Sequence, residues 1–344
     1  MLHQEQHGRL AFEGSTSRQT LVQNGGDRVD VGGWRDGFAL GTFGRDVLGR
    51  SENEAGLGGH GTIGPVEARD AEVEDFDEIG IISAANQHDV EGFLAHAGAD
   101  ARYEDRRKVL HDEGPSRPEV IRALFEMTTG WRLESEPVAI RGSRLGLTRD
   151  SYRDMTDVTQ PITMEHLTLL EVGDDNLGRY LALFDTDDLE AGFAELDARY
   201  TTGEAAAHAH TWSVITAGYA ALNHHEIPPT TPDWVNIDHR RVTPFAPGDQ
   251  IPYIRASWED TPDLAIYIEA VLRLNDRGAV FTSATHGTSR EGFDAEWRAI
   301  GIITIEGDLI ARCELFDETD IDAALARFEE LSPARAGGTR SGPP

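Results

Sequence analysis

The feature that most constrains this chain is a strand-like run that occurs twice. The second copy, residues 235–242, begins with alternating apolar residues, as a half-buried strand does, and then carries an acid, an imidazole and two guanidiniums in succession. The first copy spans residues 102–109. Aligning Glu104 with Asp238 sets an offset of 134 residues between the copies. Such self-similarity predicts that one structural unit is used twice.

The two copies also end alike. Leu183-Phe184-Asp185 closes the first and Leu315-Phe316-Asp317 closes the second, at an offset of 132 residues. Each copy is predicted as helix, strand, helix, then three or four antiparallel strands and a closing helix. Runs of strands with segregated helices indicate the α+β class. We expect two cone-shaped, curved antiparallel sheets in tandem, each packed on helices and enclosing a cavity.

Domain boundaries follow from the repeat. Residues 76–200 are predicted to form a first, degenerate domain, and residues 204–331 a second. Residues 1–75 hold fifteen of the 36 glycines, so we predict a disordered segment, or an extension that was never selected to fold. Residues 332–344 are predicted to be a disordered tail. The G-x-G-x-x-G match at 56–61 has no strand before it and is followed by Pro65, and we predict no cofactor.

Charge narrows the range of partners. The chain has 31 basic and 61 acidic residues and a net charge of −30, which disfavours nucleic acid and anionic membranes as partners. No apolar run approaches the length of a membrane span. Cys313 is the single cysteine, so no intrachain disulfide can form, and we expect a cytoplasmic location.

The order of elements resembles the nuclear transport factor 2-like superfamily, and especially its SnoaL-like polyketide-cyclase branch. The residues that carry this resemblance are Asp238-His239-Arg240-Arg241, the turn Glu306-Gly307-Asp308 and the Leu315-Phe316-Asp317 ending. Tandem domains of this type are also similar to the C-terminal modules of large actinobacterial signalling proteins. The family includes enzymes and non-enzymes, so the resemblance implies a fold and a cavity but no particular function.

Candidate site residues come from the repeated strand. Alternation places Asp238 and Arg240 on one face and His239 on the other. The resemblance implies a cavity-facing carboxylate as general acid or base, which makes Asp238 the candidate base, with Arg240 and Glu296 in support. A purely structural ion pair between Asp238 and Arg240 is the alternative. The candidate ligand-binding residues are Glu104, Arg106, Glu165, His166, His239, His286 and Trp297.

Metal binding is not predicted. On a helix, His208 and His210 point about 200° apart and cannot share an ion. We predict a non-catalytic module that binds a small apolar or carbonyl-containing ligand or mediates dimerisation, as a pseudo-dimer within the chain or as a homodimer, in a signalling or regulatory system. The alternative is a small-molecule enzyme of the cyclase, isomerase or epoxide-hydrolase type. The sequence leaves open whether the chain is an enzyme.

Overall fold

A computed structural model describes residues 80–109, 112–128, 130–156, 162–241, 245–290 and 292–331, and the short strand β1 (Val22–Gln23). The predicted disorder of residues 1–75, apart from β1, and of residues 332–344 lies outside this part of the chain. The first half of the described structure covers residues 81–202, and the second half covers residues 209–331.

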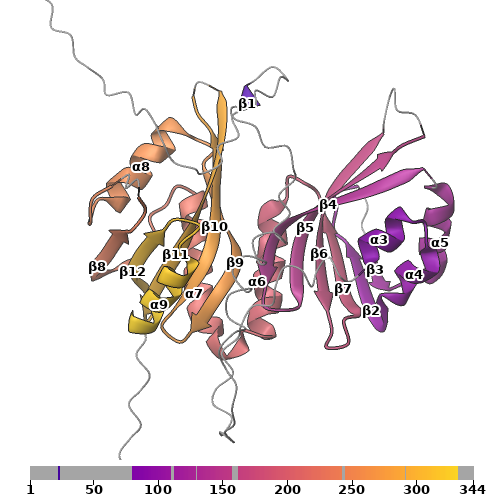
Figure 1. Cartoon of the computed structure of the whole chain (residues 1–344), viewed down its shortest axis with the longest axis horizontal. Helices are drawn as coiled ribbons and strands as arrows, with labels where there is room; N and C mark the ends of the chain where they lie inside the picture. Colours follow the sequence, from indigo (N-terminus) through magenta and orange to yellow (C-terminus); the bar gives the residue numbers. More distant parts are fainter. Residues whose placement is uncertain are drawn as a thin grey trace, which may run out of the picture.

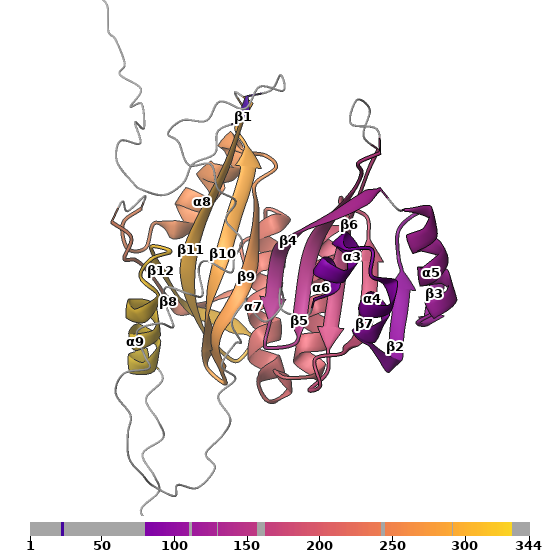
Figure 2. The ribbon, with the colours of Figure 1, turned by 45° about the vertical axis from the view of Figure 1, so that its right-hand side comes forward.

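The described strands form one twelve-stranded sheet, drawn in Figures 1 and 2. Its order is β3-β2-β7-β6-β5-β4-β9-β10-β11-β12-β8, and β1 pairs with β11 beside this path. In chain order, the strands after β1 are β2 (Ala97–Asp105), β3 (Asp112–Pro115), β4 (Trp131–Arg141), β5 (Leu145–Asp154), β6 (Thr163–Val172), β7 (Gly178–Phe184), β8 (Thr230–Asp238), β9 (Ala265–Asn275), β10 (Gly278–Thr288), β11 (Phe293–Glu306) and β12 (Leu309–Phe316).

Helices cover both faces of this sheet. They are α3 (Ile81–Asn86), α4 (Val90–Ala95), α5 (Pro118–Met127), α6 (Leu189–Thr202), the 3₁₀ turn η1 (Ala206–His208), α7 (Ala209–Asn223), α8 (Gln250–Asp260) and α9 (Ile321–Leu331). Helix α6 packs on β4 to β7, α7 packs on β9 to β12, and the two helices contact each other, so they share one side of the sheet. Helix α9 lies on the other side, against β10 and β11 (Figure 1).

The α+β prediction is confirmed, with two differences in the sheet. The halves do not form separate sheets, because β4 and β9 pair in parallel through Ile140 and Ala270. The sheet is also mixed, since β2 pairs in parallel with β7, and β8 in parallel with β12. In each half, a helix reverses the chain after the first strand, and the closing strand of the meander then returns beside that first strand.

Both halves have the same strand order, read outward from the β4·β9 junction. The first half runs β4-β5-β6-β7-β2, and the second runs β9-β10-β11-β12-β8. Asn86, at the end of α3, exchanges two hydrogen bonds with the backbone of Leu133, of 2.9 and 2.8 Å. Asn223, at the end of α7, makes the same pair with Ile266, of 3.0 and 2.8 Å. The halves therefore share specific contacts as well as strand order.

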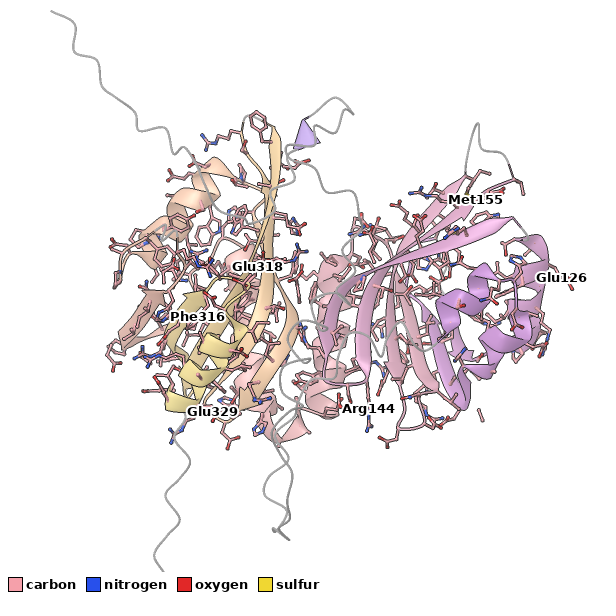
Figure 3. The ribbon with its side chains drawn as sticks, in the orientation of Figure 1. Glu126, Arg144, Met155, Phe316, Glu318 and Glu329 are labelled. Carbon is pink, nitrogen blue, oxygen red and sulfur yellow. The ribbon has the colours of Figure 1, made fainter. Side chains whose placement is uncertain are left out.

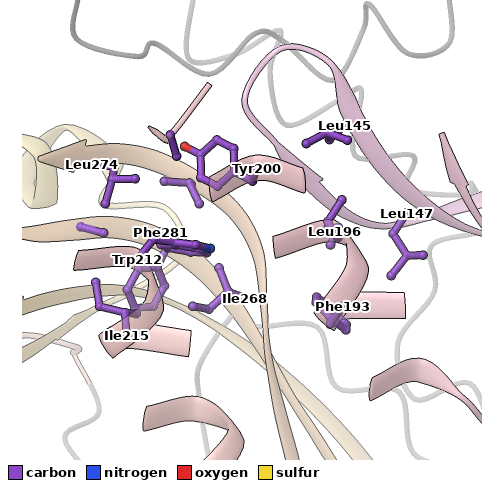
Figure 4. Close-up of a cluster of buried hydrophobic side chains, with 14 of the residues drawn as sticks. Leu145, Leu147, Phe193, Leu196, Tyr200, Trp212, Ile215, Ile268, Leu274 and Phe281 are labelled. Atoms are coloured by element: carbon purple, nitrogen blue, oxygen red, sulfur yellow. The ribbon is translucent and has the colours of Figure 1, made fainter. Parts of the chain in front are cut away.

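One hydrophobic core runs through both halves. Figure 4 shows Phe193 and Leu196 of α6, Trp212 and Ile215 of α7, and Phe281 of β10 as members of one buried cluster. Leu196, Trp212, Ile215 and Phe281 are fully buried. Each such side chain stabilises the fold by about 1.5–3 kcal/mol through burial. The helices α6 and α7 thus join the halves by apolar packing.

A single arginine crosses this junction. Arg141, at the end of β4, is only 1% exposed, and its Nε donates to Asp197 Oδ1 at 2.7 Å. Its other N–H groups donate to the carbonyl oxygens of Ile268 (3.2 Å) and Glu269 (3.3 Å) in β9. The guanidinium lies 5.1 Å from the Trp212 ring centroid. Because β4 and α6 belong to the first half, and β9 and α7 to the second, Arg141 holds the halves together.

We predict that Arg141→Met destabilises the protein by about 3–5 kcal/mol, because it leaves the Asp197 carboxylate without its buried counter-charge. Urea unfolding measures the loss. The control is Lys108→Met, which removes an ion pair with Asp187 that is exposed on both sides, and should change stability little. Equal effects of the two substitutions would contradict the role assigned to Arg141.

Candidate functional site

The second half encloses a cavity of about 160 Å³ between the sheet, α7 and α8. Its walls are mainly apolar and aromatic, and none of the described residues that line it is an aspartate, glutamate or histidine. The lining includes Tyr219, Leu222, Trp234, Arg240, Phe245, Gln250, Ile251, Tyr253, Ile254, Ser257, Trp258, Ile266, Ser283, Thr285, Trp297, Ala299, Ile303, Cys313 and Leu315.

The strand pairing beside this cavity is irregular. The pairing of β10 with β9 shifts register after Val280 and again after Thr282, and such bulges bend and twist a strand. Helix α8 forms one wall of the cavity, and its Trp258 stacks on His225 at 5.0 Å. Tyr253 and Trp297 remain 40% and 38% exposed, which places them at the rim of the cavity.

Polar groups lie at the inner end of the cavity. Gln250 begins α8, and its Nε2 lies 3.5 Å from the Sγ of Cys313 in β12. The Oε1 of Gln250 is buried and has no hydrogen-bond partner among the described residues. Burial raises the pKa of the Cys313 thiol to about 11, so at neutral pH it is protonated and a poor nucleophile.

Asp238 and Arg240 form a buried ion pair beside this end. Arg240 donates to Asp238 through its backbone N (3.0 Å), Nε (2.9 Å) and Nη2 (2.6 Å), and the two side chains are 16% and 1% exposed. The guanidinium lines the cavity, whereas Asp238 does not. Because both carboxylate oxygens are held by Arg240, Asp238 is poorly placed to act as a general base on a molecule in the cavity.

The first half contains the same ion pair, but at residues other than those the sequence alignment chose. Arg107 donates to Asp105 through N (3.1 Å), Nε (2.9 Å) and Nη2 (2.6 Å), as Arg240 does to Asp238. The structural offset is therefore 133 (residue 105 to residue 238), not 134. A shift of one residue moves every side chain of a strand to the other face, so the alignment of Glu104 with Asp238 was wrong.

Glu104 and Arg106 accordingly face α6. Arg106 Nη2 donates to Glu104 (2.6 Å), and its Nη1 donates to Glu195 of α6 (3.0 Å). Burial works against the charged form of Glu104, but hydrogen bonds from Arg106 and Tyr180 outweigh it and lower the pKa of this carboxyl. These two candidates form a structural ion-pair network between strand and helix.

His239 has the corresponding place in the second half. Its Nε2 lies 2.7 Å from Glu314 Oε2, and its ring stacks on Phe316 at 4.3 Å. Glu314 is fully buried and also accepts from Arg327 of α9. Figure 3 labels Phe316 beside α9. His239 therefore lies on the α9 face, away from the cavity.

The β11 candidates divide between the two faces. Trp297 lines the cavity. Glu296, its neighbour in the strand, points the opposite way, is exposed, and pairs with Arg298 at 2.6 Å. His286 lies opposite Glu296 in the register of the β10·β11 strand pair, and its ring stacks on Tyr267 at 5.4 Å. The structure thus places neither Glu296 nor His286 in the cavity.

The β6 candidates divide in the same way. Glu165 is exposed, whereas the next residue, His166, is only 3% exposed and stacks on Tyr152 at 5.5 Å. Matching positions in the two halves are found by following cross-strand neighbours from strand to strand, starting from Asp105 in the first half and from Asp238 in the second. On this comparison His166 matches Ala299, and Glu165 matches Arg298. Glu165 and Glu296 therefore do not occupy matching positions.

His166 belongs to a buried polar cluster in the first half. His166 lies opposite Asp150 in the register of the β5·β6 strand pair. Asp150 accepts hydrogen bonds from three hydroxyl groups, those of Ser135 (2.5 Å), Thr148 (2.9 Å) and Thr168 (2.6 Å). Burial lowers the pKa of His166, and Asp150 partly opposes this. The Nδ1 of His166 has no hydrogen-bond partner among the described residues.

Sequence reasoning missed Asp150 and Gln250. Asp150 lies in the alternating run Thr148, Asp150, Tyr152, which marks one face of β5. That pattern could have been read, but its facing partner His166 depends on register. Gln250 gives no signal, because it is one polar residue at the start of a helix.

The chain was compared with known families, curated proteins and solved structures. No family model and no curated protein matches it. Among solved structures, AusH from Aspergillus nidulans is 14% identical over 33% of this chain and 85% of its own, with a TM-score of 0.29. SalBIII, an epoxide hydrolase/cyclase-like enzyme in pyran ring formation in salinomycin, is 13% identical over 32% and 90%, with a TM-score of 0.27.

An NTF-2-like protein of unknown function from Shewanella oneidensis is 12% identical over 33% of this chain and 98% of its own, with a TM-score of 0.26. Likeness at this level says nothing about the activity or ligand of this chain. Within the described residues, no helix is long and apolar enough to cross a membrane, and no cluster of three potential metal ligands occurs.

The buried state of His166 predicts an acid-sensitive stability. Its folded pKa is lowered, so below about pH 6.5 the unfolded chain binds a proton that the folded chain does not. This contribution to stability is present above about pH 6.5 and is lost as the pH falls. In His166→Phe, which keeps a ring against Tyr152, the free energy of unfolding should fall less between about pH 7 and pH 5. The same fall in both proteins would refute this.

Proposed function

We propose that the second half is a small-molecule-binding module whose ligand is held in the cavity between α7, α8 and the sheet. The observation that carries this proposal is the composition of that cavity. Its described lining is aromatic and aliphatic, contains neither carboxylate nor imidazole, and holds one cation that is already paired with Asp238. Pockets with apolar walls and a few placed polar groups are typical of small-molecule sites.

The volume limits the ligand to a small molecule. A protein cavity of about 150 Å³ with aliphatic and aromatic walls accommodates benzene, and the present cavity is of similar size, about 160 Å³. The exposed aromatic rings of Tyr253 and Trp297 extend the apolar surface to the rim. The bound molecule is therefore one or two rings in size.

The two halves, on this proposal, are diverged copies of one SnoaL-like domain that pack as a pseudo-dimer within the chain. Support comes from the shared strand order, the Asn86 and Asn223 contacts, and the ion pairs of Asp105 and Asp238. A cytoplasmic location and a signalling role, in which occupancy of the cavity is transmitted to a partner, complete the proposal.

The test is to fill the cavity. Ala299 is buried and lines it, and Ala299→Leu should weaken the binding of indole, indene and 1-indanone at least about tenfold, because the added methyl groups take the ligand's space. Isothermal titration calorimetry measures binding. The control is Ala284→Leu, on the opposite face of β10, which should leave binding unchanged. Absence of binding of all three probes to the unmodified chain would refute the proposed function.

A second candidate function belongs to the first half. We propose that His166, whose buried Nδ1 has no hydrogen-bond partner among the described residues and which lies opposite Asp150, acts as a general base. It would remove a proton from the carbon next to a carbonyl group and return it to the enolate. The test is exchange of the α-protons of 1-indanone in D₂O, followed by NMR. His166→Phe should abolish any accelerated exchange, and Gln250→Met should not; exchange that survives His166→Phe would exclude this role.

A further inference from the structure

One residue in the wall of the second half's cavity carries a buried hydrogen-bonding group without a partner among the described residues. The Oε1 of Gln250 is buried and has no partner among the described residues, while the Nε2 of the same side chain lies against Cys313. Buried acceptors are nearly always paired, and an unpaired one is unfavourable unless a ligand or water fills its place. This oxygen belongs to a residue that lines the cavity.

Several other polar groups of the lining already have partners. The Asn223 amide is engaged by the backbone of Ile266, the Ser257 hydroxyl donates to the Tyr253 carbonyl oxygen at 3.0 Å, and Arg240 is paired with Asp238. Gln250 Oε1 is therefore a buried acceptor of the lining at which a ligand can gain a new hydrogen bond. A carboxamide oxygen accepts, so the ligand must donate.

The walls define the rest of the ligand. Trp234, Trp258 and Trp297 line the cavity, and planar aromatic molecules pack favourably on such rings. An anion is disfavoured, because it would face the partial negative charge of Oε1 while the nearby guanidinium is neutralised by Asp238. These features together point to a neutral and flat molecule.

We propose that the cavity selects a neutral aromatic molecule of one or two rings that carries an N–H or O–H donor, and that Gln250 Oε1 receives this donor. The inference rests on the proposed binding function and adds the chemical class of the ligand. Carbonyl compounds of the same shape should bind more weakly, because their oxygen would face the oxygen of Gln250.

Three probes of nearly equal shape test this: indole carries an N–H donor, indene carries no polar group, and 1-indanone carries a carbonyl acceptor. Calorimetry on the full chain should show that indole binds at least about tenfold more tightly than the other two, the usual discrimination by a buried hydrogen-bonding group. A preference for 1-indanone, or equal binding of indole and indene, overturns the inference.

Variants of α8 provide the controls. Gln250→Met keeps the size of the side chain but removes the acceptor, so indole and indene should then bind equally. Gln250→Glu keeps an acceptor and should retain the preference for indole. Ser257→Ala, on the same helix and the same cavity, should also retain it, because that hydroxyl is already bonded to the helix backbone. A Gln250→Met protein that still prefers indole would overturn the inference.

The two levels of the proposal fail differently. If all three probes bind equally and Ala299→Leu abolishes their binding, the cavity binds small molecules but Gln250 does not select them. If none of the probes binds, the proposed function fails and the inference fails with it. Thermal unfolding without ligand gives an independent reading: Gln250→Met should change the Tm little, because it removes an unpaired buried acceptor together with one long hydrogen bond to Cys313.

Discussion

The structure depends on the burial of one charge at the junction between its halves. Arg141 is almost completely buried, and a buried guanidinium is tolerated only when it is paired and hydrogen-bonded. Asp197 and the carbonyl oxygens of β9 meet that requirement, and the Trp212 ring packs beside the cation. This interaction fixes β4 against β9 and α6 against α7. The cavity of the second half is built partly on α7, so its geometry depends on the first half, although no described residue of the first half lines it.

The parallel β4·β9 junction also decides which way each half faces. In the second half, the cavity side of the sheet is covered by α7, and in the first half the same side of the continuous sheet is covered by the closing helix α6. The closing helix of the second half, α9, instead covers the other side of the sheet. Matching faces of the two halves therefore lie on opposite sides of the sheet. Their chemistry differs as well: the positions of Asp150 and His166 in the first half are held by Ser283 and Ala299 in the second. One face is polar and titratable, and the other is apolar and suited to a neutral ligand.

Much of the organisation could be predicted from the sequence, but the site could be predicted only in part. The similar strand order of the two halves and the Asp238–Arg240 ion pair both follow from local patterns. The alignment of the first copy failed by one residue, because Glu104 and Asp105 are both acidic and Arg106 and Arg107 are both basic. Composition cannot distinguish these registers, yet they place the side chains on opposite faces of the strand. The same limit applies to Glu296 and Trp297, adjacent residues of which only the second reaches the cavity.

The sequence by itself determined the α+β class and predicted that two parts of the chain share one order of elements, because both depend on periodicity, which is a property of the chain. The tertiary structure decided that the two sheets join into one, that Arg141 lies between the halves, and that Gln250 contacts Cys313 in the wall of the cavity. Gln250 and Cys313 are 63 residues apart in sequence. Contacts of this kind depend on the register and curvature of the strands, which are fixed only when the whole core packs.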